Sequence, residues 1–131
     1  MIGIVIATHR RLADELLATA REIMGEIPQA SSVCFQSSDP VDTQHGRLEA
    51  AIAKADSGDG VIVLTDMFGG TPSNVALSLM ASGKVEVLSG ASLPMLLKLS
   101  TAREGKLADI ARDVKLHAQR NITLASELLS K

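Results

Sequence analysis

The chain has 131 residues, of which 46% are hydrophobic, and its formal net charge is −2. This length fits one domain spanning 1–131 and is sufficient to bury a sizeable core. Only 2% of the residues are aromatic, so the core is aliphatic, which suits parallel strands covered by helices. The slightly acidic charge and the shortage of aromatic stacking platforms argue against a nucleic-acid partner.

The N-terminal segment is apolar only until the charged residues Arg10 and Arg11. It lacks the basic start and the cleavage pattern of a signal peptide, and no run approaches the roughly 18 apolar residues of a membrane span. We therefore expect a cytoplasmic protein that does not insert into a membrane. Cys34 is the single cysteine, which excludes an internal disulfide, and we interpret it as a small buried hydrophobe in preference to a reactive thiol.

Short apolar runs alternate with helical periodicity along the whole chain. Strands are expected at 1–7, 32–36, 61–64 and 85–88. Helices are expected at 12–24, around an apolar stripe from Leu48 to Ala55 in a helix that starts near His45, at 72–81, after Pro94, and along one last helix with an apolar face from Leu107 to Leu129. Such alternation implies an α/β fold with a mostly parallel sheet and helices on both faces. The residues leave the strand order open; the commonest small solution is doubly wound, with the first and third strands adjacent.

Two segments that follow strands are expected to meet in one crevice, because ligands of open α/β sheets bind beyond the carboxyl ends of the strands. His9 follows the first strand and Asp66 follows the third. A carboxylate that accepts a hydrogen bond from one imidazole nitrogen fixes the tautomer and leaves the other nitrogen nucleophilic. The pair thus predicts a phosphorylatable histidine, His9, oriented by Asp66.

Residues suited to hold a phosphoryl group surround this pair. Thr8 adjoins the histidine, Gly69 and Gly70 let backbone amides approach closely, and Thr71 offers a hydroxyl at the N-cap of a helix that begins with Pro72. Helix N-termini add positive dipole ends. No cluster of metal-ligating residues is visible, so we expect neither a metal nor a cofactor. On the residues alone, two alternatives remain open: His9 as a solvated loop histidine, and Gly69 and Gly70 as an ordinary tight turn.

Three motifs carry a resemblance to a known family. They are IGIVIATH at 2–9, VIVLTDMFGGTPSN at 61–74 and, more weakly, SGASLPML at 89–96. The sequence resembles, over essentially its whole length, the enzyme IIA component of mannose-type (mannose–fructose–sorbose) sugar phosphotransferase systems. The second motif is long and highly specific.

The resemblance implies a phosphotransferase that works as a phosphohistidine carrier. An HPr-type phosphocarrier donates the phosphoryl group, and a IIB protein accepts it during carbohydrate uptake. His9 matches the phosphorylated histidine of the family, Asp66 its hydrogen-bonded aspartate, and Thr71 a hydroxyl residue near the phosphate. The family fold is a mostly parallel sheet in the order 2-1-3-4, and its members are usually homodimers.

One position departs from the family pattern, because many members have glycine where this chain has Arg10. Arg10 and Arg11 are either a solvated helix start or groups that attract a phosphate or an acidic partner. This departure concerns the choice of partners and not the chemistry of His9. Since the sequence ends at Lys131 without a IIB domain, the IIB partner is expected to be a separate polypeptide.

Other residues receive plainer interpretations. His45 and His117 are expected on the surface, outside the site. Met67 and Phe68 either shield the phosphohistidine, form a docking surface, or pack beneath their loop. The apolar residues after Pro94 are expected in the core or in a dimer interface.

Three alternative functions are considered. A regulatory binding module, gated by phosphorylation of the same histidine without sugar transport, needs the same site and is not separated from a carrier by the sequence. A relative serving dihydroxyacetone phosphorylation is expected to lack the loop that this chain has at 68–72. A flavodoxin-like small-molecule binder has only Phe35 and Phe68 to flank a flavin.

Overall fold

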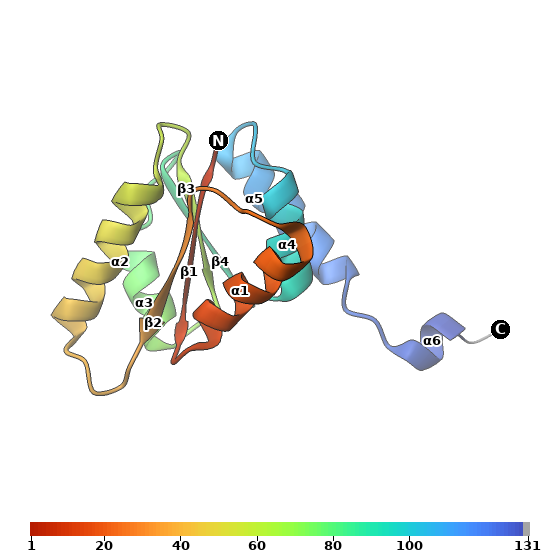
Figure 1. Ribbon diagram of the computed structural model, residues 1–131, viewed down its shortest axis with the longest axis horizontal. Helices are drawn as coiled ribbons and strands as arrows, with labels where there is room; N and C mark the ends of the chain where they lie inside the picture. Colours follow the sequence, from red (N-terminus) through yellow and green to blue (C-terminus); the bar gives the residue numbers. More distant parts are fainter. Residues whose placement is uncertain (130–131) are drawn as a thin grey trace.

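The computed structural model describes residues 1–129, in which four parallel strands form one sheet in the order β2–β1–β3–β4 (Figure 1). The strands are β1 Gly3–His9, β2 Ala30–Phe35, β3 Val61–Thr65 and β4 Val85–Ser89. The helices are α1 Leu12–Met24, α2 Val41–Ala55, α3 Thr71–Ser78, α4 Leu93–Thr101, α5 Leu107–Arg120 and α6 Ala125–Leu129. The parallel α/β fold and the expected strand order are confirmed.

The two central strands are buried on both faces, because successive side chains of a strand point to opposite sides of the sheet. Ile4 and Ile62 join one apolar cluster with residues of α1, α4 and α5. Val5 and Val63 join a second cluster with residues of α2 and α3. Helices therefore cover both faces, with α2 and α3 on one side and α1, α4 and α5 on the other (Figure 1). This is the doubly wound arrangement that the sequence predicts.

The topology places a switch point between β1 and β3. The chain leaves β1 for α1 on one face of the sheet and leaves β3 for α3 on the other face (Figure 1). The two strands are adjacent, with Ala7 paired to Thr65, so their following loops diverge around a crevice at the carboxyl edge. His9 is the last residue of β1 and is paired with Phe35 of β2, so its backbone belongs to the sheet.

The expected single last helix to Leu129 is wrong, since α5 ends at Arg120. The amide nitrogen of the Asn121 side chain donates to the His117 carbonyl at 2.9 Å and satisfies an acceptor at the helix end. Beyond it the chain leaves the body and forms the short α6, none of whose described residues is buried (Figure 1). Among the described residues, the apolar side chains of 122–129 thus remain exposed and do not join the core.

The limits of the third expected helix also differ from the structure. Gly70, and not Thr71, is the N-cap, and its carbonyl accepts the first helical bond from Asn74 at 2.9 Å. The helix ends at Ser78, before the expected end at Ala81. Ala81 instead exchanges two backbone hydrogen bonds with Val85, which turns the chain directly into β4.

Candidate functional site

The His9 ring is held by a single carboxylate. Its Nδ1 lies 2.9 Å from Oδ2 of Asp66, which also accepts the His9 backbone N–H at 3.0 Å. The other oxygen, Oδ1, accepts the backbone N–H of Met67 at 3.1 Å. A carboxylate only accepts hydrogen bonds, so Nδ1 carries the proton of the neutral ring and Nε2 keeps its lone pair. The side chain of Asp66 is 13% exposed and that of His9 is 47% exposed, so the orienting group is hidden and the ring remains accessible.

Gly70 lies against the opposite edge of the His9 ring. A Cβ atom on Gly70 would lie 2.6 Å from Cε1 and 3.0 Å from Nε2 of His9, closer than side-chain carbons pack. The ring is therefore confined between Asp66 and a residue without a side chain. This contact also places Nε2 beside the start of α3, where first-turn N–H groups have no intrahelical acceptor.

The neighbouring Gly69 has a different requirement. Its φ is +101°, while a Cβ atom there would meet nothing within 4 Å. The glycine is needed for this backbone conformation, which side chains rarely adopt, and not for space. The two glycines thus serve the loop in separate ways.

Thr8 is completely buried, and its hydroxyl is engaged by the chain itself. Oγ1 accepts the backbone N–H of Ala13 at 2.7 Å and donates to the carbonyl oxygen of His9 at 3.1 Å. These contacts tie the end of β1 to the first turn of α1. Thr8 therefore fixes the backbone that carries His9.

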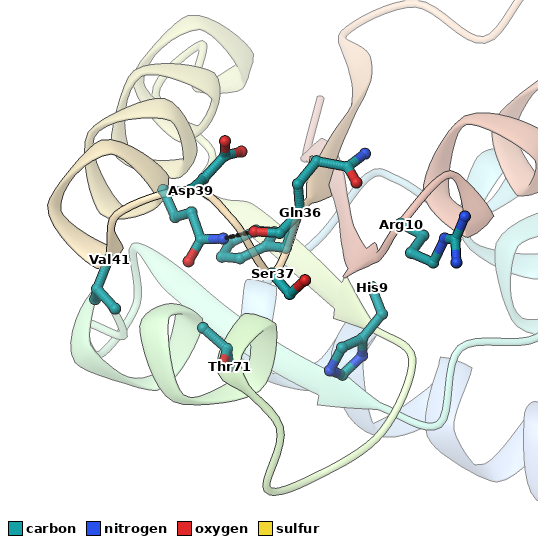
Figure 2. Close-up of a pocket in the computed structure, with 9 residues that line it drawn as sticks. His9, Arg10, Gln36, Ser37, Asp39, Val41 and Thr71 are labelled. Carbon is teal, nitrogen blue, oxygen red and sulfur yellow. Dashed lines mark hydrogen bonds between the residues drawn. The ribbon is translucent and has the colours of Figure 1, made fainter.

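A hollow of about 610 Å³ opens beside the ring (Figure 2). Its lining residues are His9, Arg10, Phe35, Gln36, Ser37, Asp39, Val41, Gln44 and Thr71. Thr71 and Ser37 lie on the wall that faces the ring (Figure 2). The site thus brings together His9, Asp66, Gly70 and Thr71 as expected.

The segment between β2 and α2 supplies a wall of the hollow that the sequence did not predict. Ser37 and Asp39 come from this segment. The strand order could have predicted this wall, because β2 lies next to β1 and its carboxyl end must reach the same edge of the sheet.

Arg10 occupies a backbone conformation suited to glycine. Its φ is +50°, and its N–H donates to the Phe35 carbonyl at 2.9 Å. The turn from β1 into α1 requires this conformation, which glycine adopts more readily than residues with a side chain. The guanidinium is exposed and is directed away from the His9 ring (Figure 2).

Met67 and Phe68 project from the loop that follows β3. Met67 is 54% exposed and Phe68 is 73% exposed, so packing beneath the loop is excluded. An exposed aromatic side chain beside a histidine is more typical of a surface that contacts another molecule than of a core.

The remaining candidate side chains lie outside the hollow. His45 is half-buried on α2, and half-buried His117 on α5 lies 3.2 Å from the side-chain amide of Asn121. Cys34 packs against the apolar cluster of α1, and burial raises the pKa of its thiol above the ordinary value. The thiol is therefore protonated at neutral pH, in agreement with a packing role.

No metal site is visible among residues 1–129, where no three His, Cys, Asp or Glu side chains gather closely enough to hold an ion. Within the same residues, no helix has the length and apolar character needed to cross a bilayer.

The substitution Gly70→Ala tests the confinement of the ring. The added methyl group is expected to displace the His9 ring and break its hydrogen bond to Asp66, because the nearest ring atom would lie 2.6 Å away. Nitrogen-15 NMR of the imidazole, at a pH where the ring is neutral, should show a protonated Nδ1 and a bare Nε2 in the wild type. In Gly70→Ala the chemical shifts of the two ring nitrogens should become averaged, because neither tautomer is selected any longer.

Gly69→Ala is the matched control. It is expected to lower the free energy of unfolding by about 1–2 kcal/mol through its positive φ, and to leave the imidazole signals unchanged because no atom lies nearby. Unchanged signals in Gly70→Ala would contradict the steric role assigned to Gly70.

Comparisons with known proteins match the chain to one family. The family described as the fructose IIA component of the phosphotransferase system (PTS) matches residues 3–115. The mannose-specific EIIAB component of Escherichia coli (strain K12) is 35% identical over 104 residues, which are 79% of this chain and 32% of that protein. The chain therefore spans about a third of the length of that relative. The fructose-specific EIIA component of Bacillus subtilis (strain 168) is 29% identical over 100% of this chain and 91% of its own length.

Solved structures show the same similarity. The component EIIA of Streptococcus agalactiae superposes with a TM-score of 0.88 at 26% identity, covering 97% of this chain and 99% of that one. The mannose/sorbose-specific IIA subunit of Enterococcus faecalis superposes with a TM-score of 0.85 at 27% identity, covering 94% and 93%. The chain therefore belongs to the family of mannose-type IIA components of the PTS, which take part in sugar phosphotransfer.

Proposed function

We propose that this chain is one IIA-type phosphocarrier domain, which works in the cytoplasm, accepts a phosphoryl group on His9 from an HPr-type protein and passes it to a IIB protein. The observation that carries this proposal is the contact between Nδ1 of His9 and Oδ2 of Asp66 at 2.9 Å. It leaves Nε2 as the nucleophile, next to the N-terminus of α3. Membership of the IIA family supports the same reaction class.

In the proposed transfer, the lone pair of His9 Nε2 attacks the phosphorus atom of the phosphoryl group that the donor carries. The new P–N bond forms as the bond between phosphorus and the donor breaks, and the electron pair of that bond returns to the donor. The Nδ1 proton of His9 stays in its hydrogen bond, so the negative charge of Asp66 stabilises the positive charge that develops on the ring. In passage to the IIB protein, a nucleophile of that protein attacks the phosphorus atom, the P–N bond breaks, and its electron pair returns to Nε2 of His9.

The phosphoryl oxygens are proposed to bind at the start of α3. Backbone N–H groups of its first turn and the exposed hydroxyl of Thr71 are available donors, and the backbone of Gly69 and Gly70 lets the group approach. A helix dipole contributes about 0.3–1 kcal/mol to such an anion, more where the group is partly buried. Thr8 is proposed to act through the backbone, because its hydroxyl is already engaged with Ala13.

Transfer between proteins also requires access. The His9 side chain is 47% exposed and lies at the edge of an open hollow, so a second protein can reach Nε2. Asp66, at 13% exposed, is shielded from competing water. This division suits a carrier that exchanges a group with protein partners.

Phosphorylation of His9 is tested with phosphoenolpyruvate, enzyme I and an HPr-type protein. Intact-mass spectrometry should show the wild-type chain gaining one phosphoryl group, and His9→Ala should gain none because the nucleophile is absent. His45→Ala and His117→Ala are matched controls that should be phosphorylated as the wild type is. A phosphorylated His9→Ala chain, or a wild type that stays unmodified, would contradict the proposal.

Asp66→Asn gives a graded readout in the same assay. An amide no longer balances the positive ring and also permits the opposite tautomer, so phosphorylation should slow by about 100-fold or more. Circular dichroism should show an unchanged fold. A wild-type rate in Asp66→Asn would remove the carboxylate from the mechanism.

We also propose that the chain forms a homodimer through its C-terminal arm, defined as residues 121–129. Ile122, Leu124, Leu128 and Leu129 on this arm are 61–84% exposed, and the arm projects from the body (Figure 1). So many large apolar side chains on one exposed segment are typical of a surface covered by another chain. A second copy offers the simplest cover, because closed twofold dimers are the commonest assembly of identical chains.

Sedimentation equilibrium tests this assembly. The wild type should have the mass of a dimer, whereas the combined variant Ile122→Ser, Leu124→Ser and Leu128→Ser should be a monomer with an intact fold. Met80→Ser is a control, since Met80 is 51% exposed outside the arm and its loss should leave the dimer unchanged. A monomeric wild type, or a dimeric triple variant, would refute a dimer built by the arm.

A further inference from the structure

The segment between β2 and α2 brings a serine side chain to the hollow beside His9. Ala7 of β1 and Phe35 of β2 belong to the apolar cluster beneath α2 and α3. His9 follows Ala7 by two residues, so its side chain projects to the same face of the sheet, and it is paired with Phe35. Ser37 lies two residues beyond Phe35 and lines the hollow together with His9 and Thr71 (Figure 2). The strand pairing thus carries Ser37 to the side of the sheet on which the His9 ring lies.

The turn that carries Ser37 is held by hydrogen bonds on both sides. The Gln36 carbonyl accepts the Asp39 backbone N–H at 3.0 Å and the side-chain amide of Gln44 at 2.7 Å. Gln44 is only 3% exposed, so a buried glutamine is committed to this turn. The Asp39 carboxylate in turn accepts a hydrogen bond from Arg47 at 3.2 Å. Because these contacts fix the turn, a group bound by Ser37 does not have to order a loop.

The Ser37 hydroxyl is available to a ligand. Ser37 is exposed to the hollow, and within residues 1–129 no hydrogen bond engages its hydroxyl. The Thr8 hydroxyl differs, because it is bonded to the Ala13 N–H and to the His9 carbonyl. A serine hydroxyl always carries one proton that it can donate. Ser37 therefore adds one hydrogen-bond donor to the hollow, on the wall that faces the His9 ring (Figure 2).

The start of α3 alone offers few donors to a phosphoryl group. The first helical turn contains Pro72, which has no N–H, so its backbone donors are the N–H groups of Thr71 and Ser73. A phosphoryl group has three strongly accepting oxygens. When the group is bonded to Nε2 of His9, α3 lies on the side of Gly70, which contacts that edge of the ring. An oxygen that is turned toward the hollow consequently requires a donor from another element.

We propose that Ser37 is a further phosphoryl-binding residue, whose hydroxyl donates a hydrogen bond to a terminal oxygen of the phosphoryl group on His9 Nε2. The proposal rests on the proposed function for the phosphorylation of His9. It adds a donor from the segment between β2 and α2 to the donors at the start of α3, so that two elements hold the group. Hydrogen bonds to charged oxygens are stronger than those between neutral groups. Ser37 therefore stabilises the phosphorylated chain relative to the unmodified chain.

The test measures the equilibrium of phosphoryl exchange with an HPr-type protein. The phosphorylated HPr-type protein is mixed with this chain, and intact-mass spectrometry quantifies both forms of each protein once their ratio is constant. This ratio depends only on the separate proteins, so a contact made solely in the docked complex does not change it. Ser37→Ala should shift the equilibrium about tenfold toward the HPr-type protein, because one hydrogen bond to a charged group is lost. Ser37→Thr keeps the hydroxyl and should stay within about threefold of the wild type.

Ser38→Ala is the matched control, because it removes the same hydroxyl from the next residue, which is exposed and does not line the hollow. It should leave the exchange equilibrium unchanged, and circular dichroism should show the wild-type fold in all three variants. A wild-type equilibrium in Ser37→Ala overturns the proposal. It does so even if transfer becomes slower, because a change in rate alone places Ser37 against the partner protein. An equal shift in Ser38→Ala also overturns it.

The failure of this proposal is distinguishable from the failure of the proposed function. A wild type that takes up no phosphoryl group contradicts the carrier function and, with it, the role of Ser37. A wild type that is phosphorylated on His9, with the same exchange equilibrium in Ser37→Ala, contradicts the role of Ser37 alone.

Discussion

The hydrogen bond between His9 Nδ1 and Asp66 Oδ2 is the interaction on which the site depends. At 2.9 Å it selects the tautomer, orients the ring and leaves Nε2 bare. Three further contacts make the geometry rigid, namely those of Asp66 with the backbone of His9 and of Met67, and that of Gly70 with the ring edge. Preorganised contacts of this kind stabilise a developing charge without reorganisation at the moment of reaction.

The sheet makes this contact possible between residues 57 positions apart. Because β1 and β3 are adjacent and parallel, with Ala7 opposite Thr65, the residues just beyond them emerge side by side. The aliphatic core on both faces keeps these strands fixed. Since α1 and α3 leave toward opposite faces, the same topology opens the hollow in which a partner can reach the ring. Burial of strands and exposure of the histidine are thus two results of one chain path.

The two-faced helix cover and the pairing of His9 with Asp66 were predictable, because alternation and burial patterns are encoded locally. The strand order followed from the resemblance that the specific motifs carry. Three features were not predictable. The role of Gly70 depends on the ring of His9, which is distant from it in the sequence. The φ of Arg10 depends on the pairing of β1 with β2, and the wall around Ser37 depends on the strand order. The prediction of a single last helix to Leu129 failed for a related reason. Apolar periodicity does not reveal whether the face at 122–129 is covered by this chain or by another.

The central claim is that Asp66 leaves Nε2 of His9 as the nucleophile. Phosphorus-31 and nitrogen-15 NMR of the phosphorylated, isotope-labelled protein tests it most directly, because one-bond phosphorus–nitrogen coupling identifies the bonded ring atom. The account predicts a phosphoryl group on Nε2, with Nδ1 still protonated and hydrogen-bonded to Asp66. A phosphoryl group on Nδ1 would contradict it.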